Sequence, residues 1–297
     1  MDTALVSQIQ HFSVGDGPGI RTTVFFQGCN LHCPWCHNPE TISRTPKLLY
    51  YASRCTGCGR CGGVCPLHTI ADGAHSLERS ACTACGRCAA VCPFGALEMS
   101  GHRRTLAELM AELTEDRDFY VSSGGGVTLS GGEPLLQADF CAALAHALTD
   151  ETIPVLLDTA GCVPYAAFEK VRPYLSLCYF DLKAATQDGY DTVGGNLALV
   201  MDNMRRLCAD GVPTVARIPV IPGFNDDAAS RERMAALLAD AGVLRVDLLP
   251  FHRLGSGKYH ALSRTYAFAD TPPLEPAAVE AMMEPFRRAG LSVARGG

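Results

Sequence analysis

The sequence has few charged residues, few aromatic residues and no excess of positive charge. Charged residues make up 19% and aromatic residues 7% of the 297, and 25 Lys and Arg against 31 Asp and Glu give a net charge of -6. This balance provides no excess of positive charge that would attract nucleic acid or an anionic membrane surface. No stretch approaches the roughly 18 uncharged apolar residues of a spanning helix, and the start Met1-Asp2-Thr3 lacks the basic and apolar segments of a secretory signal. We therefore expect a soluble, cytoplasmic protein with neither nucleic acid nor membrane as partner.

Cysteine, in contrast, is abundant, and its placement is informative. Eleven of the 15 cysteines fall in three tight groups within residues 29–92. A disulfide framework would need an oxidising compartment and is typical of short secreted chains, whereas this chain is long. The close spacing is typical of metal ligands, so the sequence predicts metal clusters rather than disulfides.

Outside residues 47–104, the apolar runs predict an α/β fold. Strand-like and helical stretches alternate at about 30 residues per unit, as in stacked βαβ units with a parallel sheet. A closed eight-unit barrel usually needs about 250 residues. Because only 239 residues remain outside this 58-residue segment, we predict an open six-unit barrel formed by residues 1–46 and 105–297. The predicted strands are Thr22–Phe26, Val127–Leu129, Val155–Leu157, Cys178–Phe180, Thr214–Val220 and Arg245–Leu249, and the predicted helices include Leu135–Thr149, Leu197–Ala209 and Ala228–Ala241.

Residues 47–104 are rich in cysteine, glycine and small residues, and they contain an internal duplication. The segment from Cys55 to Pro66 recurs from Cys82 to Pro93, 27 residues later. Both copies have the C-x2-C-x2-C-x3-C-P spacing of two-cluster bacterial ferredoxins, in which the fourth cysteine of each copy binds the other cluster. Zinc is the alternative, although its structural sites prefer paired knuckles to a third cysteine at equal spacing. The spacing predicts one [4Fe-4S] cluster on Cys55, Cys58, Cys61 and Cys92 and another on Cys82, Cys85, Cys88 and Cys65.

The first cysteine group has only three members, Cys29, Cys33 and Cys36. A [4Fe-4S] cluster held there would keep one iron without a protein thiolate. That iron could bind substrate, as the open position of a catalytic zinc does. The spacing alone also permits a zinc knuckle completed by His37.

Polar or glycine residues follow the predicted strands, except that Arg217 lies within the fifth one, Thr214–Val220. In parallel βα architectures the carboxyl ends of the strands converge on the face where ligands bind. A single polar residue there means little because loops are polar, but six strand ends carry such residues. They are Cys29, Gly131, Gly132, Glu133, Asp158, Asp181, Lys183, Arg217 and His252.

Together these motifs resemble the radical S-adenosylmethionine (SAM) superfamily, because the three-cysteine loop follows a first strand and a Gly-Gly-Glu-Pro segment follows a second. Further segments are similar to those of pyruvate formate-lyase-activating-enzyme-like activating enzymes of glycyl radical enzymes, in the subgroup with a ferredoxin-like insert. The resemblance extends from about Val6 to the C-terminus. The segments that carry it are Asp16–Thr22, Cys36–Glu40, Ser130–Pro134, Asp181–Lys183 and Leu249–His252.

The resemblance implies a partial six-unit radical SAM barrel, three [4Fe-4S] clusters and SAM as cosubstrate. SAM would bind the open iron held by Cys29, Cys33 and Cys36, and its reductive cleavage would give a 5'-deoxyadenosyl radical. This radical would remove a hydrogen atom from a backbone glycine of a partner glycyl radical enzyme under anaerobic conditions. A flavodoxin or ferredoxin-type protein would donate the electron.

The resemblance also implies which other residues bind the cofactor. Trp35 would stack on adenine or cover the cluster as a hydrophobic plug, and both roles can hold at once. The Gly131–Glu133 strip would meet the ammonium group of SAM. A monovalent cation is expected near Asp158 and Asp181. The remaining residues expected to bind the cofactor are His37, Lys183, Arg217 and His252.

Two other functions compete with this interpretation. The first is a radical SAM reaction on a small molecule, although the Asp16–Arg21 segment and the insert favour a protein substrate. The second is a non-enzymatic electron carrier with three clusters, which would leave the Gly131–Pro134 strip and the polar strand ends unexplained. The sequence does not identify the partner enzyme, and it does not separate an electron relay from a docking role for the insert.

Overall fold

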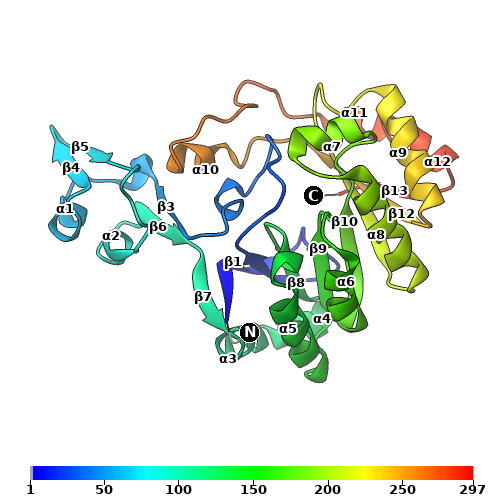
Figure 1. Cartoon of the computed structure of the whole chain (residues 1–297), viewed down its shortest axis with the longest axis horizontal. Coiled ribbons are helices and arrows are strands. Elements are labelled where there is room, and N and C mark those ends of the chain that lie inside the picture. Colours follow the sequence, from blue (N-terminus) through cyan, green and yellow to red (C-terminus); the bar gives the residue numbers. More distant parts are fainter. Residues whose placement is uncertain (1–2, 297) are drawn as a thin grey trace.

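A computed structural model describes residues 3–296 of the chain. Its centre is a nine-stranded sheet with the order β13-β12-β11-β10-β9-β8-β2-β1-β7, shown in Figure 1. The seven strands from β2 to β13 in this order are parallel, whereas β1 and β7 extend the sheet in antiparallel fashion. The strands are β1 (Thr3–Ser13), β2 (Arg21–Phe26), β7 (His102–Thr105), β8 (Gly126–Gly131), β9 (Val155–Thr159), β10 (Leu175–Asp181), β11 (Thr214–Val220), β12 (Arg245–Pro250) and β13 (Ser292–Arg295).

The six predicted strands are all present, and they form the parallel part of the sheet together with β13. The central parallel sheet of the predicted α/β fold is thus confirmed. Three strands at the ends of the sheet, β1, β7 and β13, were not predicted from the sequence.

Helices cover the outer face of the parallel sheet (Figure 1). The predicted helix Leu197–Ala209 is α8 with the same bounds, whereas the predicted helix at Leu135 begins three residues later because Pro134–Gln137 form a 3-10 turn, η3. The helices are α3 (Leu106–Thr114), α4 (Arg117–Ser123), α5 (Ala138–Asp150), α6 (Tyr165–Val171), α7 (Gln187–Val193), α8 (Leu197–Ala209), α9 (Ala228–Asp240), α10 (Ser256–Ala261), α11 (Pro276–Ala281) and α12 (Glu284–Arg288), with further 3-10 turns at Pro39–Thr41 (η1) and Arg172–Tyr174 (η4).

The strands place apolar and polar residues on opposite faces because successive side chains alternate. On β10, Cys178 and Phe180 are fully buried in the main core, whereas Tyr179 and Asp181 point to the inner face. The same alternation separates Leu157 from Asp158 on β9. The outer face therefore packs against helices, and the inner face is free to bind a ligand.

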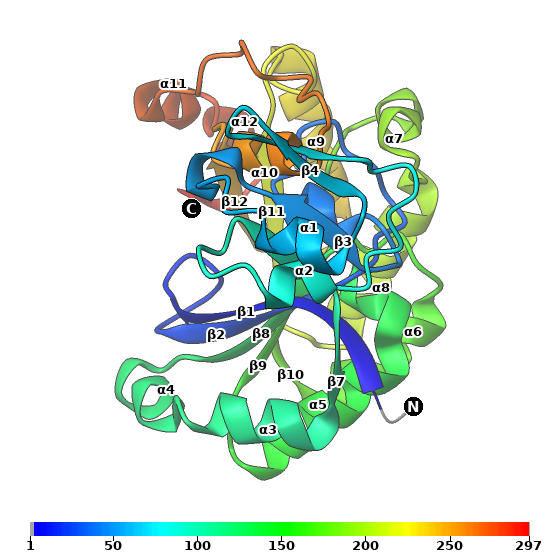
Figure 2. The ribbon, with the colours of Figure 1, turned by 90° about the vertical axis from the view of Figure 1, so that its left-hand side faces the viewer.

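Residues 47–100 form a smaller body with its own core, on the left of Figure 1 and facing the viewer in Figure 2. Leu48, Cys61, Cys88 and Leu97 are buried together, apart from the main core. Two short antiparallel pairs, β3 with β6 and β4 with β5, frame this body. The chain then returns to the main sheet through β7, so residues 102–105 pair with β1. Its elements are β3 (Lys47–Tyr50), η2 (Ala52–Arg54), α1 (Arg60–Val64), β4 (His68–Ala71), β5 (Ala74–Leu77), α2 (Arg87–Ala90) and β6 (Leu97–Ser100).

Across residues 3–296, every helix is too short or too polar to cross a membrane.

Candidate functional site

A cavity of about 700 Å³ opens at the carboxyl ends of the parallel strands. It collects the sequence-predicted residues from the five strands β8 to β12 and from the loop after β2. The predicted residues that line it are Cys29, Cys33, Trp35, Cys36, His37, Gly131, Gly132, Asp158, Asp181, Lys183, Arg217 and His252. Glu133 is not among the described residues that line the cavity.

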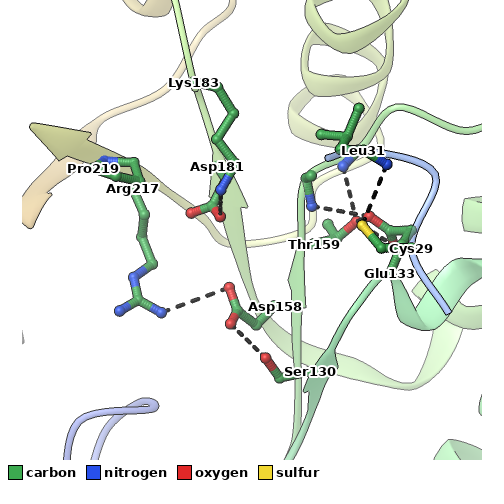
Figure 3. Close-up of polar contacts among 12 residues, drawn as sticks. Cys29, Leu31, Ser130, Glu133, Asp158, Thr159, Asp181, Lys183, Arg217 and Pro219 are labelled. Atoms are coloured by element: carbon green, nitrogen blue, oxygen red, sulfur yellow. Dashed lines mark hydrogen bonds and ion pairs between the residues drawn. The ribbon is translucent and has the colours of Figure 1, made fainter. Parts of the chain in front are cut away.

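Charged side chains from three neighbouring strands form the floor of this cavity (Figure 3). Asp158 accepts a hydrogen bond from Ser130 Oγ at 2.7 Å, and its other oxygen lies 3.6 Å from Arg217 Nη1. Asp181 lies 2.5 Å from Lys183 Nζ. Burial raises the pKa of Asp158 although Arg217 opposes this shift. Burial lowers the pKa of Lys183. The attraction of Asp181 and Cys33 outweighs the effect of burial, so the pKa of Lys183 is raised.

The three-cysteine loop is held in place by backbone hydrogen bonds to the segment that follows it. The amide of Gly28 donates to the carbonyl of Thr41 at 2.7 Å, and the amide of Cys29 donates to that of Ile42 at 3.1 Å. Burial raises the pKa of Cys29 and of Cys36 to about 12. Metal binding requires thiolates, so these thiols need the positive charge of a bound metal to ionise.

The geometry of this loop does not favour a single zinc ion. Within residues 3–296, the only three His, Cys, Asp or Glu side chains with ligand atoms within 4.8 Å of one another are Cys61, His68 and His75. His37 stacks on His252 at 4.2 Å, and its Nε2 lies 3.1 Å from the carbonyl of His252. Burial and the neighbouring His252 lower the pKa of His37 to about 4, so the ring is neutral. Three cysteines spread around one cavity suit an iron-sulfur cluster, which is wider than one ion.

The strip at the end of β8 needs its glycines for packing. A Cβ on Gly131 would lie 2.3 Å from the amide nitrogen of Phe26, and a Cβ on Gly132 would lie 2.2 Å from the carbonyl oxygen of Gly28. Gly131 also has a φ of 119°, which strains other residues. The glycines therefore let β8 approach β2 closely at the edge of the cavity.

Glu133 is buried and does not line the cavity, and Figure 3 shows its carboxylate beside Thr159. Its carboxylate accepts hydrogen bonds from Thr159 Oγ1 at 2.8 Å and from the amides of Ala160 and Leu135 at 3.0 and 3.1 Å. It is fully buried, and burial raises its pKa to about 7. In this arrangement the side chain of Glu133 holds the end of β9 next to the glycine strip. The contact of the strip with SAM stays a prediction.

Trp35 packs in an aromatic cluster and also lines the cavity. Its ring lies 4.5 Å from that of Phe224 and 6.3 Å from that of Phe268, so its outer side packs in an aromatic cluster. Trp35 is only 5% exposed, yet it lines the cavity beside Cys36. The ring can cover a cluster and present an edge to a ligand.

The eight remaining predicted cysteines gather in two further cavities in residues 47–100. Each cavity is lined by four of them, and the grouping matches the crossed pattern predicted from the spacing. One set is Cys55, Cys58, Cys61 and Cys92, and the other is Cys65, Cys82, Cys85 and Cys88.

Some cavity residues were not predicted individually. Asp16 lines the cavity from the turn between β1 and β2 and accepts a hydrogen bond from Thr23 at 2.8 Å. Ser130 reaches Asp158, and Arg295 lines the cavity from β13. Asp16 and Ser130 stand in segments that the resemblance singled out, so a closer reading could have found them. Arg295 is the last residue of the short strand β13, which the sequence did not predict, so no pattern pointed to it.

The fold and the three-cysteine cavity define the class of protein. The family model described as "4Fe-4S single cluster domain" matches residues 15–163, which include the cysteine loop and the glycine strip. A radical SAM methyltransferase from Sphaerobacter thermophilus shares the fold, with a TM-score of 0.54 over 98% of this chain and 76% of that chain at 16% identity. The chain is a radical SAM protein with a 4Fe-4S cluster.

Full-length relatives narrow this class further. The chain is 40% identical to the benzylsuccinate synthase activating enzyme of Thauera aromatica and 38% identical to the pyruvate formate-lyase 2-activating enzyme of Escherichia coli K12. Both alignments cover 100% of this chain and 94% of the relative. The chain belongs to the activating enzymes of glycyl radical enzymes, and the resemblance seen in the sequence is confirmed.

Proposed function

We propose that this chain cleaves SAM reductively at a [4Fe-4S] cluster held by Cys29, Cys33 and Cys36. The resulting 5'-deoxyadenosyl radical removes a hydrogen atom from a backbone glycine of a partner glycyl radical enzyme. The observation that carries this proposal is the convergence of the three cysteines and the charged strand ends on one cavity. The relatives are named for different partner enzymes, so membership of the family leaves the partner open.

Three cysteines suit a cluster that keeps one iron open. When bound, the cluster supplies one electron and an iron to which the amino and carboxylate groups of SAM can bind. The three side chains are partly buried and line the same cavity. Gly131 and Gly132 form the cavity edge, where a small ligand meets backbone rather than side chains.

The charged floor suits the mixed charges of SAM. Arg217 and Lys183 can orient the carboxylate of SAM, because both line the cavity and are held by carboxylate partners. Asp158 and Asp181 can bind the ammonium group or a monovalent cation. Trp35 suits adenine, and His37 and His252 suit the nucleoside. This assignment of contacts is part of the proposal.

We further propose that the sheet is a partial six-unit barrel and that residues 47–104 are a ferredoxin-like insert with two more [4Fe-4S] clusters. The crossed grouping of the eight cysteines in two cavities supports this count. The insert clusters would pass electrons from a flavodoxin or ferredoxin-type donor. We place the reaction in the cytoplasm because thiols stay reduced there.

Product formation from SAM tests the proposed activity. Anaerobically reconstituted and reduced protein is mixed with SAM, and 5'-deoxyadenosine is quantified for the wild type and for Cys36→Ala. We expect product from the wild type and none from the variant, because loss of one thiol leaves the cluster unsupported. Cys208→Ala is the matched control, since Cys208 is partly buried and stands apart from the cavity lining.

The same preparation also tests the protein substrate. A candidate glycyl radical enzyme added to the mixture should acquire the electron paramagnetic resonance (EPR) signal of a glycyl radical. Absence of both SAM binding and product in iron-replete, reducible wild type would refute the proposed reaction.

A further inference from the structure

The hairpin formed by β4 and β5 lies between the two cysteine repeats and carries two histidines. Asp72 and Gly73 form its turn, both with positive φ of 51° and 76°, as a tight two-residue hairpin requires. The register pairs His68 with Leu77 and Ile70 with His75. Because alternate residues of a strand share a face, both histidines lie on the face turned toward the cysteines.

The two imidazole rings are hydrogen-bonded to each other. His68 Nδ1 lies 2.8 Å from His75 Nε2. The two outer nitrogens, His68 Nε2 and His75 Nδ1, are buried, and neither has a hydrogen-bond partner within the described part of the chain. Buried polar atoms are normally paired because an unpaired one costs free energy. The two outer nitrogens therefore lack hydrogen-bond partners, and a further group in this region could bond to the one that carries a hydrogen.

The pair spans the space between the two cysteine cavities. His68 lines the cavity of Cys65, Cys82, Cys85 and Cys88, whereas His75 lines the cavity of Cys55, Cys58, Cys61 and Cys92. The Cys61 sulfur lies within 4.8 Å of a nitrogen of each ring. Tyr50 packs on His75 with ring centres 4.3 Å apart, which fixes the ring from the other side.

The hydrogen atoms of such a pair are constrained. A neutral histidine has one N–H group. If His68 donates across the 2.8 Å contact, the hydrogen of His75 is on its outer Nδ1, and if His75 donates, the hydrogen of His68 is on its outer Nε2. One outer nitrogen is thus always a donor, and the other is an acceptor.

We propose that His68 and His75 form a hydrogen-bonded bridge that lies between the two insert clusters and that its outer N–H group donates to a sulfur of the cluster held by Cys61, whereas its outer acceptor makes no hydrogen bond to a cluster sulfur. This inference rests on the proposed insert clusters. Hydrogen bonds to cluster sulfurs stabilise the more negative, reduced state and therefore raise the reduction potential. The two histidines act as positioning residues that make this cluster easier to reduce than its neighbour.

EPR-monitored redox titration of full-length, anaerobically reconstituted protein tests the bridge. His75→Phe keeps an aromatic ring against Tyr50 but removes its nitrogens. We expect the equilibrium constant for reduction of the Cys61 cluster to fall about tenfold, which corresponds to 59 mV for a one-electron couple. His75→Asn retains a donor at the δ position and should restore part of the potential.

Matched variants separate the bridge from a general effect on the insert. His102→Phe replaces an exposed histidine of β7, which bonds to the Met99 carbonyl, and should leave the potential unchanged. His68→Phe breaks the same imidazole contact and should give a smaller shift of the same sign. If His75→Phe does not retain iron, His68→Phe provides the test.

The outcomes distinguish this inference from the proposed function. Unchanged potentials in iron-replete His75→Phe and His68→Phe would overturn the bridge while leaving the clusters in place. Zinc bound by Cys61, His68 and His75, in place of a second insert cluster, would overturn the bridge and the cluster count. Neither result affects SAM cleavage at Cys29, Cys33 and Cys36, which the deoxyadenosine assay measures separately.

Discussion

At the scale of single residues, the Lys183–Asp181 pair links the stability of the fold to the site. Both side chains are largely buried, with 12% and 19% of their surfaces exposed, and their charged atoms are 2.5 Å apart. Removing one partner of such a pair leaves an uncompensated charge in a poorly solvated position.

Lys183→Met should destabilise the cluster-free protein by about 3 kcal/mol, since breaking a buried pair costs roughly this much. The measurement is chemical denaturation with the free energy of unfolding as readout. Lys183→Met combined with Asp181→Asn should recover part of the loss because the unpaired charge is removed. A loss in the single variant that the double variant fails to reduce would contradict the role of the charge.

Glu133 predicts a pH dependence of stability. Burial raises its pKa from 4.5 in the unfolded chain to about 7, so the folded state binds more protons than the unfolded state between these values. The stabilising contribution of the protonated carboxyl is complete below pH 4.5 and is lost as the pH rises through about 7, with a magnitude on the order of 3 kcal/mol. Unfolding free energies of cluster-free wild type and Glu133→Gln, compared over this range, check the difference in slope. Parallel pH profiles would show that Glu133 is not the titrating group.

Gly132→Ala should damage the site through backbone packing. The added Cβ would lie 2.2 Å from the Gly28 carbonyl oxygen, so the end of β8 must move away from the cysteine loop. We expect a lower melting temperature and loss of iron from the first cluster, measured by thermal unfolding and iron analysis. Gly15→Ala is the control, since a Cβ there meets nothing within 4 Å, and it should behave like the wild type.

At the scale of elements, α10 connects the insert to the cysteine loop. Arg79 from the insert donates to the carbonyls of Leu48 and Ala261 at 2.8 and 2.5 Å and to Ser263 Oγ at 2.7 Å. Lys258 in α10 bonds to Asn38 and Glu40, just after the third cysteine of the loop, at 2.7 and 2.5 Å. The insert is thereby anchored to the same helix that holds the three-cysteine loop.

Arg79→Ala should loosen this connection without unfolding the main sheet. We expect faster amide hydrogen exchange in residues 256–263 and in the insert, while exchange in β9 and β10 stays as in the wild type. Arg103→Ala, at an exposed position of β7, is the control and should change neither region. Exchange rates in α10 that match the wild type would contradict the anchoring role.

The sequence predicted elements well where burial dictates their composition. The six central strands are apolar on the core side, and the cysteine spacing indicated the grouping that the two insert cavities have. The missed strands lie at or near the ends of the sheet, where fewer residues are buried, as in His102–Thr105 and Ser292–Arg295. The direction of the Glu133 side chain depends on Thr159 and Ala160 from the next strand, and no local pattern encodes such a contact.

At the scale of the whole molecule, the chain has two separately packed regions that hold cysteines. The insert has its own small core around Leu48 and Leu97, apart from the main core that surrounds Cys29 and Cys33. Each region should therefore bind its iron-sulfur clusters independently of the other.

Replacing Cys29, Cys33 and Cys36 by alanine should remove about a third of the iron and leave the insert loaded, since one of three proposed clusters loses its ligands. Iron and sulfide analysis with EPR spectroscopy measures this. Replacing the eight insert cysteines should have the reciprocal effect and remove about two thirds. Complete loss of iron in the first variant would show that the regions load together.

The entry and exit of the insert lie side by side. Lys47 pairs with Ser100 in the β3–β6 ladder, and a Cβ on Gly101 would lie 3.1 Å from the Cα of Pro46. The insert therefore leaves and rejoins the rest of the chain at neighbouring points. Because the entropy of closing a loop rises only slowly with its length, a gene could gain or lose this segment in one step without altering the path of the surrounding strands. The same geometry would let a short turn replace residues 47–100 while the three-cysteine loop and the sheet keep their positions.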